Sequence, residues 1–567
     1  MTVTQNQTGT SRVKNPWLIM AVICIPVFVG SLDLTIVSAF LPELIVDLEL
    51  PPQTGLDDAA WILSAYLLAY TVGLAIMGRI SDLIGRRAVY AICLIIFIVG
   101  SVLVAIAHGA PTDLLFRLYR RMGERPDIAY VELQAIIFGR VVQAFGAGAL
   151  VPVSLALVGD MFPPQKRARP LGLVGAIDTL GWVLGHLYGG VLVNFFYTNA
   201  DNFRTFFDRI GLESASLPDW RTLFWINVPL TLFALVATLW ALRGVPMKRV
   251  KGRFDFLGAG LIVVALVALN VGLGANIDIG GTTSSFSDLS QLPPYALPLL
   301  TVFVIGMLLF VLVESRVRDP LFNLKMFRRR NISMGLLSNL FIGYCLFIGL
   351  VIVPILVNVR LEDSSGLREA ALEVGILLSA LTIPMSLATV PGGWLSDRIG
   401  YSRTIIAGLS LSVVGFLAIW QTWDMDIGTL AISIQMALVG IGIGLTFSPI
   451  SASVINSATD DERGAASALV IILRLVGMTI SVSSLTTFAL QRVTALAVGE
   501  LGEAGVNVAA YADTYARITV RVLGELGLLG AILCGVAMIP ALFMHNRDVT
   551  PPETTTTDEV TSTVMAE

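Results

Sequence analysis

Two short stretches far apart in the chain follow one pattern. Residues 78–87 read Gly-Arg-Ile-Ser-Asp-Leu-Ile-Gly-Arg-Arg, and residues 393–403 read Gly-Trp-Leu-Ser-Asp-Arg-Ile-Gly-Tyr-Ser-Arg. The first glycine, the serine, the aspartate and the second glycine match in register, and each stretch follows a long apolar run. Chance is a poor explanation for such a match at the same place in each half. The repeat therefore predicts a duplicated protein with two homologous halves.

The composition indicates that lipid surrounds most of this chain. Of its 567 residues, 55% are hydrophobic and 14% are charged, whereas about a quarter of the residues of soluble domains are charged. A membrane-spanning helix needs about 20 apolar residues, and the chain contains about fourteen runs of that kind. The runs centre near Val29, Leu68, Ile95, Phe145, Val183, Leu232, Val264, Val304, Phe347, Leu378, Leu409, Val439, Ile480 and Cys534. None of them alternates as membrane β-strands do, so we predict an all-α membrane protein.

The distribution of lysine predicts the orientation of the spans. If the N-terminus is cytoplasmic, every lysine falls on the cytoplasmic side, as the positive-inside rule requires. The lysines are Lys14, Lys166, Lys248, Lys251 and Lys325. We therefore expect a multi-pass protein of the cell (inner or plasma) membrane with both termini in the cytoplasm. The N-terminal tail, 1–16, is polar, and the Thr-rich tail, 546–567, has the composition of a disordered segment.

Nothing in the sequence indicates catalysis or metal binding. The four cysteines lie singly in apolar runs, so neither disulfides nor a metal motif is expected. The chain also lacks a phosphate-binding loop and a His-rich helix. We expect no enzyme activity, no cofactor, no metal and no nucleic-acid partner.

Together with the repeat, several motifs resemble the major facilitator superfamily. The repeated stretch is similar to the signature loop after the second span of that family. Further matches are Leu32-Asp33 through Val37, Arg140 through Gln143 to Gly146, Trp220-Arg221, Ile226-Asn227-Val-Pro229, Asp461 to Gly464, and Arg474 to Gly477. The set looks like the fourteen-span drug:proton antiporter branch.

This resemblance implies the major facilitator fold, two six-helix bundles plus two inserted central spans. The N-terminal bundle would cover residues 17–243 and the C-terminal bundle residues 331–545. The linker, 244–330, would hold the two extra spans. Transporters built from such repeats place the substrate near the bilayer midplane between the halves.

Ionisable residues inside the spans are candidates for proton coupling and for the substrate cavity, because a charge in lipid is kept where it faces a cavity or a partner. Asp33 lies in the middle of the first span, where a carboxylate can exchange a proton for a cationic substrate. Arg140 must have an acceptor, because a guanidinium keeps its charge, and the family resemblance implies that it takes part in proton coupling. Arg474 is the corresponding candidate in the C-terminal bundle. Each of them could instead be a structural residue, hydrogen-bonded or ion-paired.

The fifth span carries two more candidates. Asp178 and His186 are eight residues apart, which places them about 80° apart around a helix. His186 could relay protons or make a fixed hydrogen bond, and it stands where the family's antiporter motif has proline, which weakens the case for export. Four glycines of this span permit close helix packing, namely Gly181, Gly185, Gly189 and Gly190.

The repeated loops are candidates for a gate on the cytoplasmic side. Asp82 and Asp397 lie at helix ends, where basic neighbours and the N-termini of other helices can bind a carboxylate. Such contacts would close this side in one state and break in the other. The gating residues are Gly78, Asp82, Gly85, Arg86, Arg87, Gly393, Asp397, Arg398 and Gly400. Alternatively, the basic residues serve only as topology anchors.

Two loops on the external side are unexpectedly long. Residues 109–133 and 194–220 each contain apolar residues at helical spacing. In the first loop, arginines lie opposite them, which suits an interfacial amphipathic helix. These loops could brace the bundle or bind an external partner.

Our main hypothesis is a secondary active transporter driven by the proton gradient. It would export small hydrophobic or amphipathic, drug-like compounds by alternating access, in exchange for protons. The altered antiporter motif and the long loops motivate an alternative, the transport of a membrane lipid or lipid-like molecule. A third hypothesis is a membrane sensor or assembly scaffold that moves nothing.

Overall fold

A computed structural model describes most of the chain, and all regular secondary structure among the described residues is helical. These are residues 15–37, 40–50, 55–209, 217–245, 249–250, 252–273, 294–360, 367–501 and 508–545. The predicted tail 546–567 and nearly all of the tail 1–16 lie outside them. The helices are α1 (Pro16–Ile36), α2 (Leu41–Asp47), α3 (Gly55–Ile84), α4 (Arg86–Ala105), α5 (Ala110–Arg121), α6 (Ile128–Ala147), α7 (Leu150–Met161), α8 (Ala168–Thr198), α9 (Ala200–Arg209), α10 (Arg221–Ala241), α11 (Phe256–Gly272), α12 (Ala296–Glu314), α13 (Arg330–Val359), α14 (Leu367–Ile399), α15 (Tyr401–Thr422), α16 (Thr429–Ser457), α17 (Arg463–Leu501) and α18 (Val508–Leu542).

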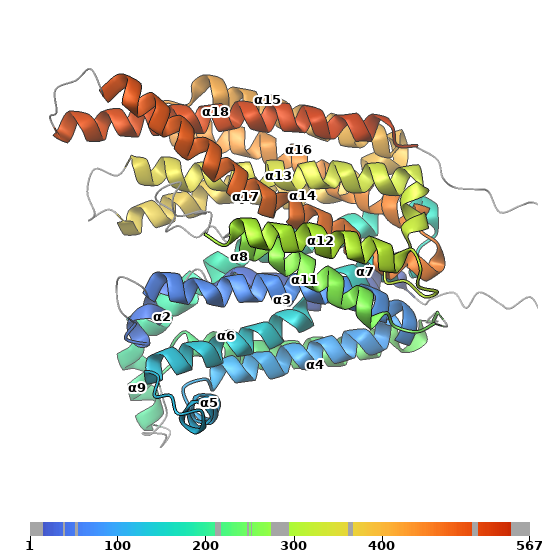
Figure 1. The fold of residues 1–567 in the computed structure, drawn as a ribbon, viewed down its shortest axis with the longest axis horizontal. Helices are drawn as coiled ribbons and strands as arrows, with labels where there is room; N and C mark the ends of the chain where they lie inside the picture. The colour runs from blue at the N-terminus through green and yellow to red at the C-terminus, as the bar shows by residue number, and fades with distance from the viewer. Residues whose placement is uncertain are drawn as a thin grey trace, which may run out of the picture.

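The predicted all-α membrane fold with about fourteen spans is confirmed. Within the described residues, thirteen helical stretches are long and apolar enough to cross a membrane, and α6 and α7 together make one of them. The shorter apolar helix α11, of 17 residues, is the fourteenth. The long helices run side by side, along the horizontal of Figure 1.

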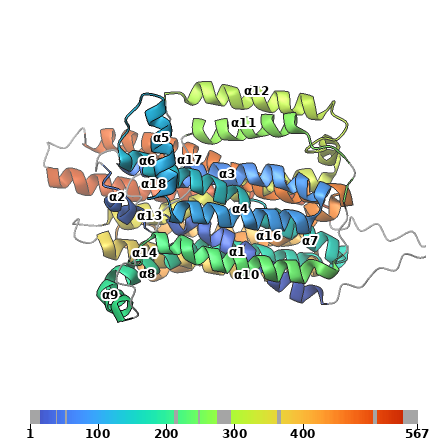
Figure 2. The same cartoon turned by 90° about the horizontal axis from the view of Figure 1, so that it is seen from below.

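Both chain ends lie at one end of this helical array. Helix α18 ends at the right of Figure 1, and α1 begins at the right of Figure 2. Asn331, at the start of α13, donates a hydrogen bond to the backbone oxygen of His545 just beyond α18. We call this end the terminal face and the other end the opposite face. At the opposite face α17 and α18 extend furthest, since their 39 and 35 residues correspond to about 58 and 52 Å of helix.

The spans pack in two groups. Helices α1 to α10 pack mainly on one another, which we call the N-terminal half, and α13 to α18 form the C-terminal half. The halves meet where α8 lies against α14 and α16, and where α3 and α7 lie against α17. The inserted pair, α11 and α12, packs at the edge of the array against α3 (Figure 2), and Thr479 of α17 donates a hydrogen bond to Asn270 of α11 at 3.0 Å. The predicted domain boundaries themselves stay predictions.

Glycines allow the closest helix approaches. A Cβ on Gly100 of α4 would overlap the backbone of Gln143 in α6. On α8, a Cβ on Gly181 would lie 2.7 Å from the Cβ of Ser31, and one on Gly185 would overlap Thr35 of α1. In the same helix Gly189 is buried and Gly190 half-buried. These contacts bring polar side chains of neighbouring helices within hydrogen-bond reach.

The second glycine of the repeat has a backbone role in both halves. Gly85 and Gly400 precede α4 and α15 with φ of 96° and 92°, in a region that side chains other than glycine's adopt only with strain. The chain therefore turns from one span into the next in the same way at both copies of the repeat.

We expect the substitution Gly100→Ala to destabilise the protein. The added methyl group has no room against α6, and overpacking of this kind costs about 1–3 kcal/mol. The matched control is Gly535→Ala on α18, where a Cβ would meet no atom within 4 Å. Thermal unfolding of the purified variants in one detergent measures both. Equal melting temperatures for the two variants would contradict the packing described here.

Candidate functional site

The first polar cluster surrounds Asp33 in the middle of α1. The guanidinium of Arg140 lies 2.6 Å from Asp33 Oδ2 and also donates to the backbone oxygen of Asp33 at 3.1 Å. The amides of Asn227 and Gln143 donate to Asp33 Oδ1 at 2.7 and 3.0 Å. All four side chains are fully buried. Asp33 is therefore the acceptor that the sequence required for Arg140.

Two further side chains complete this cluster. Gln143 also donates to Ser101 of α4 at 2.8 Å, and the guanidinium of Arg140 stacks on the ring of Tyr66 in α3 at 3.9 Å. The cluster thus joins α1, α3, α4, α6 and α10. We had not predicted Tyr66, Ser101 or Asn227 as site residues. The available signal was a polar side chain inside an apolar run, which ordinary helix packing also produces.

The second polar cluster joins the two halves. Asp178 of α8 faces Arg474 of α17, with 3.4 Å between Oδ2 and Nη2. Ser31 of α1 donates to the other carboxylate oxygen at 2.7 Å, and the guanidinium of Arg474 lies 4.5 Å from the ring centre of Phe447. The structure thus brings together two residues that we had chosen in separate bundles. The side chain of His186 lies outside the described part of the chain.

Helix α1 separates the two clusters. Ser31 and Asp33 are two residues apart, about 200° around the helix, so Ser31 faces Asp178 while Asp33 faces Arg140. A movement of α1 relative to both α6 and α8 would therefore disturb both clusters together. This geometry links a contact between the halves to one inside the N-terminal half.

A network at the terminal face connects the first repeat to α17. Asp82 pairs with Arg86 at 3.0 Å and accepts hydrogen bonds from the backbone N–H groups of Gly464 and Ala465 at 3.1 and 3.3 Å. These two residues begin α17, where unpaired N–H groups and the helix dipole favour an anion. Asp82 is fully buried.

Asp160 of α7 extends this network. Its carboxylate lies 2.8 Å from Arg86 and 3.2 Å from Arg463. Arg463 belongs to α17, so the chain of alternating charges crosses from one half to the other. We call the contacts of Asp82, Arg86, Asp160 and the start of α17 the first latch.

The second repeat makes the corresponding contact to α8, but a weaker one. Asp397 lies 3.3 Å from Arg169 in the first turn of α8, and the arginine side chain is 49% exposed. Where the first repeat has Arg86 after its glycine, the second has Tyr401, so Asp397 has no arginine at that position. We call this contact the second latch.

The first glycine of each repeat also touches the other half. A Cβ on Gly78 would lie 2.9 Å from the oxygen of Gly464, and one on Gly393 would lie 2.6 Å from the oxygen of Ala168. The remaining gating candidates do not take part. Arg87 makes no ion pair with a described residue, and Arg398 stacks on Trp394 at 3.8 Å.

The structure is closed at the terminal face. Both latches lie there, and so does Arg167, which donates to Asn456 of the other half at 2.8 Å. Burial lowers the pKa of Arg167 to about 10, which leaves it charged at neutral pH. Moving from the latches toward the opposite face, the next of the contacts described above that joins the two halves is the ion pair of Asp178 with Arg474.

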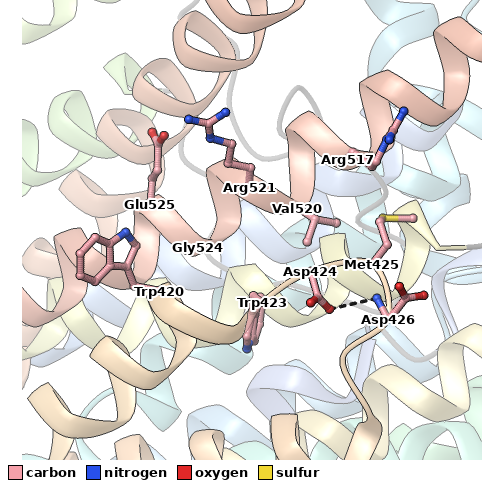
Figure 3. A pocket seen from close by; sticks show the side chains of 10 residues that line it. All are labelled: Trp420, Trp423, Asp424, Met425, Asp426, Arg517, Val520, Arg521, Gly524 and Glu525. Atoms are coloured by element: carbon pink, nitrogen blue, oxygen red, sulfur yellow. Dashed lines mark hydrogen bonds between the residues drawn. The ribbon is translucent and has the colours of Figure 1, made fainter.

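A cavity of about 520 Å³ lies away from these clusters, between the end of α15 and α18. Trp420, the loop from Trp423 to Asp426, and α18 residues from Arg517 to Glu525 line it. Figure 3 shows that Arg517 and Arg521 point away from the turn in which the backbone N–H of Asp426 donates to the side chain of Asp424. None of the predicted site residues lines this cavity.

Comparisons with known proteins identify the family of this chain. Residues 23–482 match the sequence model of the Major Facilitator Superfamily. A triacylglyceride transporter of Mycolicibacterium smegmatis is 27% identical over 92% of this chain and 86% of its own length. One of Mycobacterium tuberculosis is 28% identical over 92% and 93%. The drug:proton branch suggested by the motifs stays a prediction.

Solved structures share the fold. The proton:xylose symporter XylE has a TM-score of 0.52 at 15% identity, covering 91% of this chain and 94% of its own. The human organic anion transporter MFSD10 has a TM-score of 0.52 at 16% identity, covering 91% and 99%. At sequence identities this low, the likeness to these structures shows only that the fold is shared.

We expect the substitution Asp33→Asn to be strongly destabilising, because it leaves the buried guanidinium of Arg140 without a counter-charge, a loss of about 3–5 kcal/mol. The double variant Asp33→Asn with Arg140→Gln removes both charges and should be the more stable of the two. Thermal unfolding of the purified proteins compares them. A double variant less stable than the single one would show that the pair is not the interaction that matters.

The two latches should differ in strength. Asp82→Asn breaks a buried pair, whereas Asp397→Asn removes a half-exposed one worth about 0–1 kcal/mol. Spin labels at Lys166→Cys and Arg403→Cys, both exposed, would report the separation of the halves at the terminal face. We expect a large shift toward the longer distance for Asp82→Asn and a small one for Asp397→Asn. Equal shifts would contradict the asymmetry.

Proposed function

Since this chain belongs to the Major Facilitator Superfamily, we propose that it carries a lipid or lipid-like molecule through the membrane in exchange for protons. The chain is a multi-pass membrane transporter and not an enzyme. The names of its relatives favour the lipid alternative over drug export, our main hypothesis. The proposal needs no cofactor, because the proton gradient supplies the energy.

The surface along which the two halves meet, which we call the seam, lies between α3, α7 and α8 on one side and α14, α16 and α17 on the other. Its apolar character is the observation that supports an apolar cargo. One continuous hydrophobic cluster includes Tyr70 of α3, Val174 of α8, Met385 of α14 and Phe447 of α16. A site for a sugar or another polar cargo needs several polar groups that point at it. Here the charged groups that meet across the seam at mid-depth, Asp178 and Arg474, are occupied by each other.

Protons act on this ion pair. When Asp178 takes up a proton it loses its charge, and the attraction that holds α8 to α17 is lost. Ser31 still bonds to the carboxyl group, so α1 stays with α8. Loss of the proton restores the pair and draws the halves together. A proton and the position of the halves are thereby linked, as exchange transport requires.

The Asp33 cluster transmits or tunes this change within the N-terminal half. Because Ser31 and Asp33 share α1, a shift of α1 that follows the protonation of Asp178 alters the distance from Asp33 to Arg140. Arg140 keeps its charge, so it favours the charged form of Asp33 for as long as the two stay in contact. We therefore propose that the Asp178–Arg474 pair and the Asp33–Arg140 pair respond together to protonation, because α1 connects them.

We place the terminal face in the cytoplasm. Lys166 and Arg330 lie at this face together with the arginines of both latches, which fits the positive-inside rule. In that orientation the structure is the state closed to the cytoplasm. Opening of the latches would expose the seam to the inner leaflet, where a lipid cargo is dissolved.

Reconstituted vesicles test the proposal. With purified protein and a fluorescent triacylglyceride, we expect transfer that slows when an ionophore dissipates the pH gradient. Asp178→Asn should slow it by about tenfold or more, as expected when an interaction of at least 1.4 kcal/mol is lost. The control is Asp513→Asn, which removes a carboxylate that is 64% exposed and pairs with Arg517 on α18.

Each outcome has a separate meaning. Lipid transfer that ignores the ionophore and Asp178→Asn would refute proton coupling. Proton-dependent transport of cationic drugs without lipid transfer would restore drug export. The absence of any flux, with the protein folded, would leave the scaffold hypothesis.

A further inference from the structure

Helix α5 lies across the membrane spans at the opposite face. It is seen end-on in Figure 1 and upright in Figure 2, while the spans run horizontally in both. It connects the end of α4, at Ala105, to the start of α6, at Ile128. Its axis therefore lies in the plane of the membrane, at the depth where two spans end.

One side of α5 is fixed to the protein. Thr112 donates to the backbone oxygen of Ala107 at 2.6 Å, and Tyr119 donates to Gln134 of α6 at 2.7 Å. Leu115 packs against a cluster of buried residues from neighbouring spans, which includes Val104 and Leu133. At about 100° per residue, Thr112, Leu115 and Tyr119 fall on one side of the helix. The orientation of its other sides is therefore set.

A second side is apolar and uncovered. Leu114, Leu118 and Met122 follow one another at intervals of four residues, and they are 70%, 52% and 67% exposed. A stripe of three large exposed side chains at the level of the span ends is in the place where hydrocarbon of a lipid bilayer can cover it.

The third side is cationic. Arg117, Arg120 and Arg121 are exposed, and none of them forms an ion pair with a described residue. Asp113 also lies on this side, which leaves α5 with a net charge of +2, from three arginines and one aspartate. Arg120 lies 5.4 Å from the ring centre of Phe116, which favours one position for its guanidinium.

We propose that α5 is a binding site for anionic phospholipid in the leaflet at the opposite face. Leu114, Leu118 and Met122 lie among the upper parts of the acyl chains. The three arginines bind the phosphate groups. The helix then keeps anionic lipids bound beside α4 and α6. This binding does not depend on what the transporter carries.

The order of the three sides favours lipid over a protein partner. The charged side lies opposite the edge between the protein side and the apolar side, as in helices that lie in a membrane interface. A folded protein partner would have to cover the apolar stripe while facing the edge of the bilayer. Charge complementarity fits the negative headgroups of phosphatidylglycerol, since each arginine near such a surface contributes attraction.

The position of the stripe can be measured with spin labels. The four native cysteines are buried, so labels can be placed singly at Leu118→Cys and, as the matched neighbour, at Arg117→Cys. In lipid nanodiscs we expect the label at 118 to be relaxed by oxygen, which dissolves in lipid, and the label at 117 by a water-soluble nickel chelate. Two labels relaxed equally by the chelate would overturn the proposal, and so would a label at 118 shielded from both reagents.

The lipid preference is measured on the same full-length protein. Nanodiscs contain phosphatidylcholine alone or with an equal amount of phosphatidylglycerol, and native mass spectrometry counts the retained lipids. We expect phosphatidylglycerol to be retained in preference, and its apparent affinity to fall about fivefold for each arginine replaced in Arg117→Gln, Arg120→Gln and Arg121→Gln. Arg517→Gln removes a guanidinium from α18 that is 62% exposed, and should change nothing. An unchanged preference in the triple variant would overturn the proposal.

Discussion

A charge inside a membrane costs several kcal/mol unless a partner neutralises it, and this constraint explains where the polar residues of this protein lie. Asp33 and Arg140 neutralise each other inside one half, and Asp178 and Arg474 do so across the boundary. The first pair lies within one half, so the distance between its members changes only when α1 shifts within that half. The second pair has to open whenever the halves part, so a proton is the simplest substitute for the lost partner.

An apolar seam also limits how finely a transporter can choose its cargo. One methylene more or less in a hydrophobic site changes binding by only about 1–3 kcal/mol. Selection by the size and shape of the seam is therefore coarse. A lipid and a hydrophobic drug would contact much the same apolar side chains. The sequence features described above therefore fit drug export and lipid transport alike.

The sequence alone was enough for the architecture and for choosing several charged residues that the structure brings into contact, but not for their pairings. Span length and the repeat predicted the helices, and the second glycine of each repeat occupies the same positive-φ turn. Arg140 required an acceptor, yet Asp33 lies 107 residues away, and Asp178 lies 296 residues from Arg474. Which residues meet over such separations depends on how each helix is rotated. Tyr66 and Ser101 were missed because one polar residue in an apolar run looks the same whether it packs or binds, and Asn227 was noted only as part of a motif.

The two latches descend from one repeated loop, but they hold the terminal face with unequal strength. We expect the exposed contact between Asp397 and Arg169 to break more readily than the buried one around Asp82. On the α8 side the halves are held mainly by packing against α14 and α16 and by Arg167, whereas on the α3 side the buried charges around Asp82 add to the packing against α17. The two copies of the repeat thus keep the same turn but differ in their partners, because Arg86 in one copy corresponds to Tyr401 in the other and only the first copy reaches Asp160.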